Sequence, residues 1–348
     1  MSAVPPIATG RVVDPSLEPA SMPGQVPTPA AAAIDPDAQS PEAANCNWAR
    51  TPERSNAFAL KVMTWIALFF GRTVARCVLH PITLYFMFFA PTARRHSKRY
   101  LGRALGRPAT FVDGYRHVHA FTATILDRVY LLRDKLSRFD VRTTGRDLVD
   151  GTLAEGRGAF LVGAHVGSFE VLRVLGDTRG DLKVAMVMYP DNARLINAAL
   201  QAIAPDSAPE IIALGRVESM LAVRDWLDAG GLAGILGDRR LPGESERSND
   251  VRVSFLGVEA TFSDGPFRLA ALLRRRVLFM AGPHVGGNRY DVRFETLADF
   301  SGRLGPAERE QRIVEAVHAY AARLEALCRA YPYNWFNFLD FWDEDTTP

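Results

Sequence analysis

Downstream of Pro108, short apolar runs alternate with helical stretches, and this pattern limits the possible folds more than any other feature. Two stretches between the runs, 192–204 and 217–229, have helical spacing. Strand and helix repeated in this way predict an α/β fold with a mixed, mostly parallel central sheet flanked by helices. The apolar runs, each predicted to be a buried strand, are 159–164, 183–189, 211–214, 232–236 and 277–281.

Three C-terminal segments complete the predicted domain. Residues 289–296 (RYDVRFET) alternate between polar and apolar side chains, which predicts an antiparallel edge strand. Residues 306–331 have the pattern of a long amphipathic helix. The following PYNWFNFLDFW is too aromatic for free chain, so we expect it to pack against the domain, with contact to an acyl chain or a bilayer interface as the alternative.

The segment before this domain has an unusual charge distribution. Residues 54–112 contain ten lysines and arginines and no acidic residue, although the formal net charge of the chain is only +2. Two apolar runs, 62–70 and 77–90, lie within the segment, and each is shorter than the roughly 20 residues that span a bilayer. Arg72 and Arg76 between them disfavour one straight span.

The cations that follow these runs can reach anionic headgroups, each contributing about 1 kcal/mol near such a surface. They are Arg94, Arg95, Lys98, Arg99, Arg103 and Arg107. We therefore predict a membrane-associated helical anchor at 47–107, either interfacial or a shallow helical hairpin, with core helices bearing a solvated basic face as the alternative. Apolar residues interleaved at this density suit lipid better than nucleic acid.

The N-terminal region differs in composition from the predicted anchor and from the α/β domain. Residues 1–45 hold nine of the 22 prolines, and a segment of this composition buries too little apolar surface to fold, which predicts a disordered tail at 1–46. The chain opens without a basic and apolar leader, and its three cysteines form no framework. These features predict a reducing compartment and a catalytic part that faces the cytoplasm.

A histidine and a glutamate follow the first predicted strand of the domain, in GAFLVGAHVGSFE (158–170). His165 comes directly after the apolar run, and ligands of open α/β sheets bind at the carboxyl ends of strands. Glu170 in the first turn of a following helix can fix the tautomer of the imidazole, so that His165 acts as a general base. The alternative is a strand-end histidine beside a helix-capping glutamate.

Other strand ends carry further candidates. Asp238, Arg239 and Arg240 follow the run at 232–236, where the arginines can bind a phosphate or an oxyanion; a structural ion pair is the alternative. Arg216 follows the run at 211–214 and is a weaker candidate of the same kind. His284 has no nearby carboxylate and is interpreted as structural. In addition, Ser263-Asp264-Gly265 predicts a helix N-cap whose amides can face an anion.

Several motifs are missing from the sequence. It contains no G-x-S-x-G, no G-x-x-x-x-G-K, no H-E-x-x-H and no G-x-G-x-x-G. Serine-hydrolase, nucleotide-binding and metal-site interpretations therefore lose support, and we predict neither a cofactor nor a metal.

From about Trp48 to Trp342 the sequence resembles the lysophospholipid acyltransferase superfamily, and within it the bacterial lipid A late (lauroyl/myristoyl) acyltransferases and their side branches. The resemblance rests on the H-x4-E spacing, on GILGDRR (234–240), on 251–271 with its Phe-x-Gly turn, on the apolar and basic anchor, and on the aromatic tail. Ser168-Phe169 stands where the family often has Asn-Trp, which indicates a side branch and leaves Ser168 a candidate substrate contact.

The resemblance implies a glycerolipid acyltransferase-like catalytic domain at 108–348. The implied reaction is direct acyl transfer from an acyl carrier protein or coenzyme A thioester to a hydroxyl or amine of a lipid or glycolipid. The implied location is the cytoplasmic face of a bacterial inner membrane. A thioesterase or lipid esterase with the same dyad, and a non-catalytic membrane-binding protein on this scaffold, remain the alternatives.

Overall fold

The computed structural model describes residues 64–133, 136–172, 183–189, 210–239 and 250–342. Contacts divide the chain into two units, Met1–Ala44 and Asn45–Pro348, and the first lies wholly outside the described residues. The predicted tail at 1–46 and the predicted helix at 192–204 also lie outside them. The following description therefore concerns the second unit.

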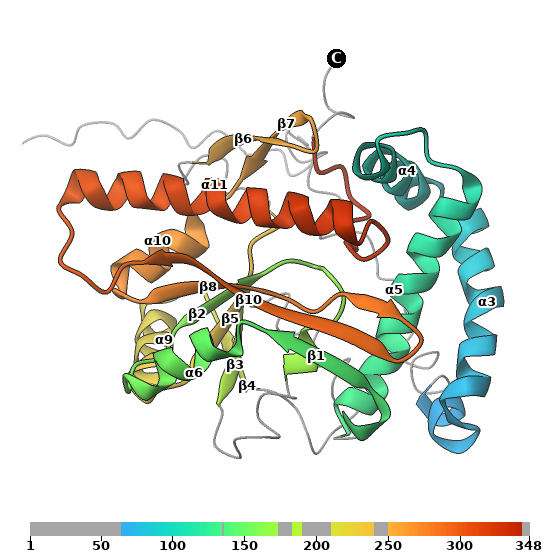
Figure 1. Ribbon diagram of the computed structural model, residues 1–348, viewed down its shortest axis with the longest axis horizontal. Helices are drawn as coiled ribbons and strands as arrows, with labels where there is room; N and C mark the ends of the chain where they lie inside the picture. Colours follow the sequence, from blue (N-terminus) through green and yellow to red (C-terminus); the bar gives the residue numbers. More distant parts are fainter. Residues whose placement is uncertain (1–63, 134–135, 173–182, 190–209, 240–249, 343–348) are drawn as a thin grey trace, which may run out of the picture. The chain divides into compact units, whose positions relative to one another are not determined.

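A mixed, mostly parallel sheet forms the centre of this unit, as the sequence predicts (Figure 1). Its strand order is β1-β10-β8-β2-β5-β3-β4, and β8, β2, β5, β3 and β4 are parallel neighbours. The structure confirms all five strands predicted from apolar runs. Their bounds are β2 Phe160–Gly163, β3 Val184–Met188, β4 Glu210–Ala213, β5 Leu232–Leu236 and β8 Arg276–Ala281.

The expectation of an edge strand at 289–296 is wrong in one respect. β10 (Arg289–Asp299) is antiparallel to β8, as predicted, but β1 (Asp140–Thr144) pairs with its other side and forms the edge. The alternation in β10 therefore does not mark the end of the sheet. Its start also pairs with the short β9 (His284–Gly286), and a separate hairpin joins β6 (Val251–Phe255) to β7 (Val258–Phe262).

Alternate strand residues face two different hydrophobic clusters. Phe160, Val162 and Phe279 belong to one cluster, whereas Leu161 and Leu278 belong to the other. The first cluster includes residues of α9 (Val217–Asp228), α10 (Gly265–Leu272) and α11 (Pro306–Ala330), and the second includes residues of α5 (Phe111–Leu131) and α6 (Arg146–Ala154). Helices thus cover both faces of the sheet, and its interior strands are apolar on both sides.

The described part of the predicted anchor includes α3 (Gly71–Phe89) and α4 (Pro91–Leu105), and residues 64–69 of the first apolar run are also helical. The second apolar run forms most of α3, but the helix also passes through Arg72 and Arg76 rather than starting after them. Within the described residues no single helix passes a length-and-hydropathy test for a membrane span, whereas α3 and α4 pass it together as a pair bent by 97°.

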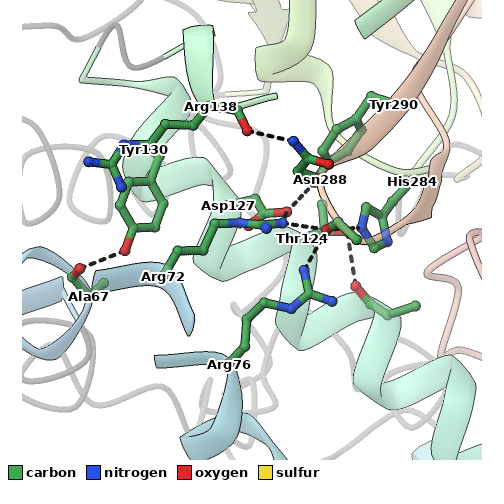
Figure 2. Close-up of polar contacts among 12 residues, drawn as sticks. Ala67, Arg72, Arg76, Thr124, Asp127, Tyr130, Arg138, His284, Asn288 and Tyr290 are labelled. Carbon is green, nitrogen blue, oxygen red and sulfur yellow. Dashed lines mark hydrogen bonds and ion pairs between the residues drawn. The ribbon is translucent and has the colours of Figure 1, made fainter. Parts of the chain in front are cut away.

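Hydrogen bonds to the rest of the domain explain why two arginines occur in the apolar helix α3, which lies beside α5 (Figure 2). Arg72 donates to both carboxylate oxygens of Asp127 on α5, at 2.7 and 2.9 Å, and the Asp127 side chain is 0% exposed. Tyr290 donates its hydroxyl to the same carboxylate at 3.0 Å. Arg72 and Arg76 both donate to the carbonyl of Gly287, in the turn between β9 and β10. The two arginines therefore fasten α3 to the domain.

The aromatic C-terminal segment packs on the domain, as the sequence predicts. Trp335 is buried and makes edge-on ring contacts with Tyr100 of α4 and Phe255 of β6, with centroids 4.9 and 5.5 Å apart. Its backbone carbonyl accepts a hydrogen bond from the buried His117 of α5 at 2.8 Å. The segment thus joins α4, α5 and the β6–β7 hairpin.

Candidate active site

His165 and Asp238 meet at the carboxyl edge of the sheet because β2 and β5 are adjacent and parallel. Gly163 is in register with Leu236, and both strands end at this pair. His165 and Asp238 each lie two residues beyond the end of their strand. His165 Nδ1 is 2.8 Å from Asp238 Oδ1, and the backbone N–H of His165 donates to Oδ2 at 3.0 Å.

Asp238 is fully buried and ionised. Burial by itself would raise its pKa, but the charge that His165 carries when protonated at low pH, the hydrogen bonds from His165 and Trp335, and the charge of Arg239 outweigh burial and hold the pKa of Asp238 at about 2. The indole Nε1 of Trp335 donates to Oδ2 at 2.7 Å. An ionised carboxylate only accepts, so Nδ1 of His165 carries the proton that bonds it.

This arrangement leaves Nε2 of the neutral imidazole as the proton acceptor. Among the described residues, none hydrogen-bonds to this atom, and the His165 side chain is 28% exposed. Burial lowers the pKa of His165, the nearby charges of Arg239 and Arg128 lower it further, and Asp238 opposes them. The imidazole is therefore neutral at pH 7, with an accessible basic nitrogen.

A tight turn directs His165 out of the strand. Gly167 has φ +62°, and a Cβ at this position would lie 1.9 Å from the carbonyl oxygen of Gly282. The amide of Gly167 donates to the carbonyl of Asn334, and the amide of Phe336 donates to the carbonyl of His165. The aromatic tail thus holds the backbone of the histidine loop on one side, while β8 and its extension hold it on the other.

Glu170 does not pair with His165, contrary to the expectation from the H-x4-E spacing. It lies in a 3-10 helix, η3 (Phe169–Leu172), and its Oε1 is 2.7 Å from Nε of Arg128 on α5. Ser168 donates its hydroxyl to Oε2 at 2.7 Å. Asp238 from the neighbouring strand takes the place that the sequence assigned to Glu170.

The remaining candidates are distributed unevenly around His165. Arg239 lies close enough for its charge to act on His165, and it donates to the carbonyl of Phe336 at 3.3 Å. Ser168 is buried and donates its hydroxyl to Glu170, so its side chain is not exposed to a substrate in this structure. Arg216 is exposed after β4, three strand spacings or roughly 14 Å from β2. Arg240 lies outside the described residues.

Two further interpretations from the sequence have clear structural counterparts. His284 is buried, its amide donates to the Asn334 side chain at 2.7 Å, and its Nε2 is 3.2 Å from the carbonyl of Gly287, which fits a structural role. Asp264 occupies the N-cap position of α10, but its side chain makes no capping bond and instead accepts from Arg268. The cap bond predicted from Ser263-Asp264-Gly265 is limited to Gly265 N–H donating to Ser263 Oγ at 3.2 Å.

Sequence reasoning missed two side chains that contact the site residues, Arg128 and Trp335. Arg128 lies in a helix with an ordinary amphipathic pattern, and no motif marks it. The aromatic composition around Trp335 predicts packing, and nothing in the sequence indicates that its indole donates a hydrogen bond to Asp238. Within the described residues, no group of three or more His, Cys, Asp or Glu side chains is arranged to hold a metal ion.

Comparisons with known proteins do not identify a family for this chain. No protein-family model matches the sequence, and the search of curated proteins found no significant match. Functional arguments for this chain therefore rest on its own residues.

Proposed function

We propose that this chain is an acyltransferase that moves a fatty acyl group from a thioester donor to a hydroxyl or amine of a lipid or glycolipid acceptor. The observation that carries the proposal is the hydrogen bond between His165 Nδ1 and the buried, ionised Asp238, which leaves Nε2 of His165 as an accessible base. Acyl carrier protein or coenzyme A is the proposed carrier of the thioester, on the resemblance described above.

The proposed chemistry needs one base and no covalent enzyme intermediate. Nε2 of His165 accepts the proton of the acceptor O–H or N–H, and the freed oxygen or nitrogen attacks the thioester carbonyl. The tetrahedral intermediate then collapses, the C–S bond breaks, and the leaving sulfur takes the proton from the imidazolium. Asp238 stabilises the imidazolium in between, since its carboxylate already accepts the Nδ1 proton.

Dependence on an acceptor separates this proposal from a hydrolase. We expect purified full-length protein, given acyl carrier protein or coenzyme A loaded with a labelled acyl chain, to release thiol only when lipid acceptor is present. Candidate acceptors come from lipid extracts of a strain that lacks the gene, with labelled lipid detected by mass spectrometry. His165→Ala protein is the matched control. Free fatty acid formed at an equal rate without any acceptor contradicts acyl transfer and identifies a thioesterase.

The α3–α4 segment supports a second part of the proposal, attachment to the cytoplasmic face of the inner membrane. A pocket of about 600 Å³ along α4 has no acidic residue among the described residues that line it, and its cations are Arg95, Lys98, Arg99, Arg103 and Arg107. Exposed apolar rings occur before α3, along it and after it: Trp65, Phe69, Phe70, Tyr85, Phe88, Phe89 and Phe111. Apolar rings beside cations are the combination that binds an anionic bilayer interface.

Liposome sedimentation tests this attachment. We expect full-length protein to pellet with anionic vesicles, and Arg95→Glu with Lys98→Glu to weaken partitioning by at least about 30-fold, since each lost cation removes about 1 kcal/mol and each new carboxylate is repelled by the surface. High salt should weaken binding without abolishing it, because the apolar part is not screened. The matched control reverses two exposed arginines, Arg303 and Arg309, before and at the start of α11. Wild-type protein that stays in the supernatant at low salt contradicts the attachment.

A further inference from the structure

Each oxygen of the Glu170 carboxylate has a close polar partner, and neither partner is His165. One oxygen is 2.7 Å from Nε of Arg128, and the other accepts the Ser168 hydroxyl at 2.7 Å. Glu170 and Ser168 are both buried, so this pair forms a fixed support. A buried carboxylate held in this way orients the guanidinium that it faces.

The opposite side of the Arg128 guanidinium is open. A guanidinium has five N–H donors, and the 2.7 Å contact with Glu170 is at Nε. No described residue accepts a hydrogen bond from either Nη group of Arg128, and the side chain is 29% exposed. Arg128 is therefore a cation fixed from behind by a carboxylate, with its fork of Nη donors free to bind a ligand.

Arg128 belongs to the surroundings of His165 even though it comes from a distant helix. Glu170 follows His165 by five residues, across the turn at Gly167, and η3 packs against α5. The charged groups that act on the imidazole are Asp238 and Arg239 from the segment after β5 and Arg128 from α5. Positive charge thus lies near the imidazole on two different elements.

We propose that the Nη groups of Arg128 bind a negatively charged oxygen of the substrate beside His165, and that Glu170 and Ser168 are the positioning residues for Arg128. This inference rests on the proposed function. In this proposal the two residues of the H-x4-E motif have separate roles. His165 transfers the proton, whereas Glu170 holds the anion-binding Arg128 in position.

Two sources supply an oxygen of this kind. One is the oxyanion that forms on the thioester carbonyl when the acceptor attacks, which a guanidinium stabilises only as the charge develops. The other is a phosphate already present on the acceptor or on the carrier, which a guanidinium binds in the ground state as well. The first affects kcat, and the second affects KM.

An anion titration tests the site without any acyl transfer. Full-length protein in detergent micelles, labelled at the histidine ring carbons, is titrated by NMR in sodium sulfate and in sodium chloride of equal ionic strength, with the His165→Ala spectrum giving the assignment. We expect sulfate to raise the pKa of His165 in the wild type and to lose this effect in Arg128→Met. A sulfate effect that is absent, or equal in both proteins, overturns the proposal.

Kinetics then identify the oxygen. We expect Arg128→Met to lower kcat/KM by about 10²-fold, as loss of one anion-stabilising donor group does, and Arg128→Lys to restore part of it. A change in kcat alone identifies the oxyanion, and a change in KM alone identifies a phosphate. Values within about threefold of wild type for folded Arg128→Met overturn the substrate role. If sulfate binds through Arg128 but no acyl transfer occurs, the anion site stands and the proposed function fails.

Two further variants serve as controls. Arg128→Met with Glu170→Gln removes both charges together, so it tests the site without leaving a buried unpaired carboxylate. Arg276→Met removes an arginine that also pairs with carboxylates, Asp299 and Glu155, but at the start of β8 and so at the opposite edge of the sheet. We expect the Arg276 variant to retain wild-type kinetics and the wild-type sulfate effect.

Discussion

His165→Ala is expected to lower the rate of the proposed acyl transfer by at least about 10²-fold, because it removes the proposed general base. Asp238→Asn should have an effect of similar size, although the asparagine keeps the volume. Its amide can donate to Nδ1, which then stops being the protonated nitrogen, and the tautomer left with a proton on Nε2 cannot accept one. Steady-state rates with saturating acyl donor measure both variants.

Glu170→Gln is the matched comparison for Asp238→Asn. Glu170 does not touch the imidazole, so its loss should reduce the rate less than Asp238→Asn and leave the pH profile near that of the wild type. In the wild type the rate should fall as the pH drops through the pKa of His165, which burial holds below its ordinary value. Near-wild-type turnover by folded His165→Ala protein would end the proposed mechanism, and a larger loss for Glu170→Gln than for Asp238→Asn would reassign the carboxylate.

Arg72→Met should destabilise the protein by about 3–5 kcal/mol, the usual range when one partner of a buried ion pair is removed. The Asp127 carboxylate, which is 0% exposed, would then keep only the Tyr290 hydroxyl as a hydrogen-bond donor among the described residues. The loss should also loosen α3 from α5 and from the β9–β10 turn, because Arg72 contacts both (Figure 2). Chemical unfolding in one detergent measures the first effect, and limited proteolysis of α3 measures the second.

Two variants separate the ion pair from a general effect of lost packing. Arg76→Met removes a guanidinium that donates to the carbonyl of Gly287, and a single hydrogen bond from a charged group contributes at most about 1.5–3 kcal/mol. Arg72→Met combined with Asp127→Leu leaves no uncompensated charge and should recover much of the lost stability. If Arg72→Met proves no more destabilising than Arg76→Met, the Arg72–Asp127 pair does not hold α3 in place.

Several features of this protein follow from the sequence alone. The five parallel strands are marked by short apolar runs, because strands of a sheet covered by helices on both faces carry mostly apolar side chains. The helix α11 and the packed aromatic tail follow from an amphipathic period and from ring content. His165 at a strand end also follows, since the apolar run stops directly before it. All of these are local patterns.

Side-chain partners across the sheet were decided only by the tertiary structure. His165 meets Asp238 because β2 lies beside β5 in register, although β3 and β4 come between them in the chain. The H-x4-E spacing favoured Glu170, since sequence distance is all that a motif contains. Glu170 instead faces Arg128, which a turn at Gly167 and the packing of η3 on α5 bring to it.

The edge of the sheet and the role of Arg72 have the same explanation. The alternation in β10 suggests an edge strand. In the structure β1, from a distant part of the chain, forms a parallel pair with the outer edge of β10. From the sequence, Arg72 is an isolated charge within an apolar segment. The structure pairs it with the buried Asp127, which lies 55 residues away in the chain. Periodicity and composition report how one segment is solvated, whereas strand order and ion pairing depend on which distant segments pack together.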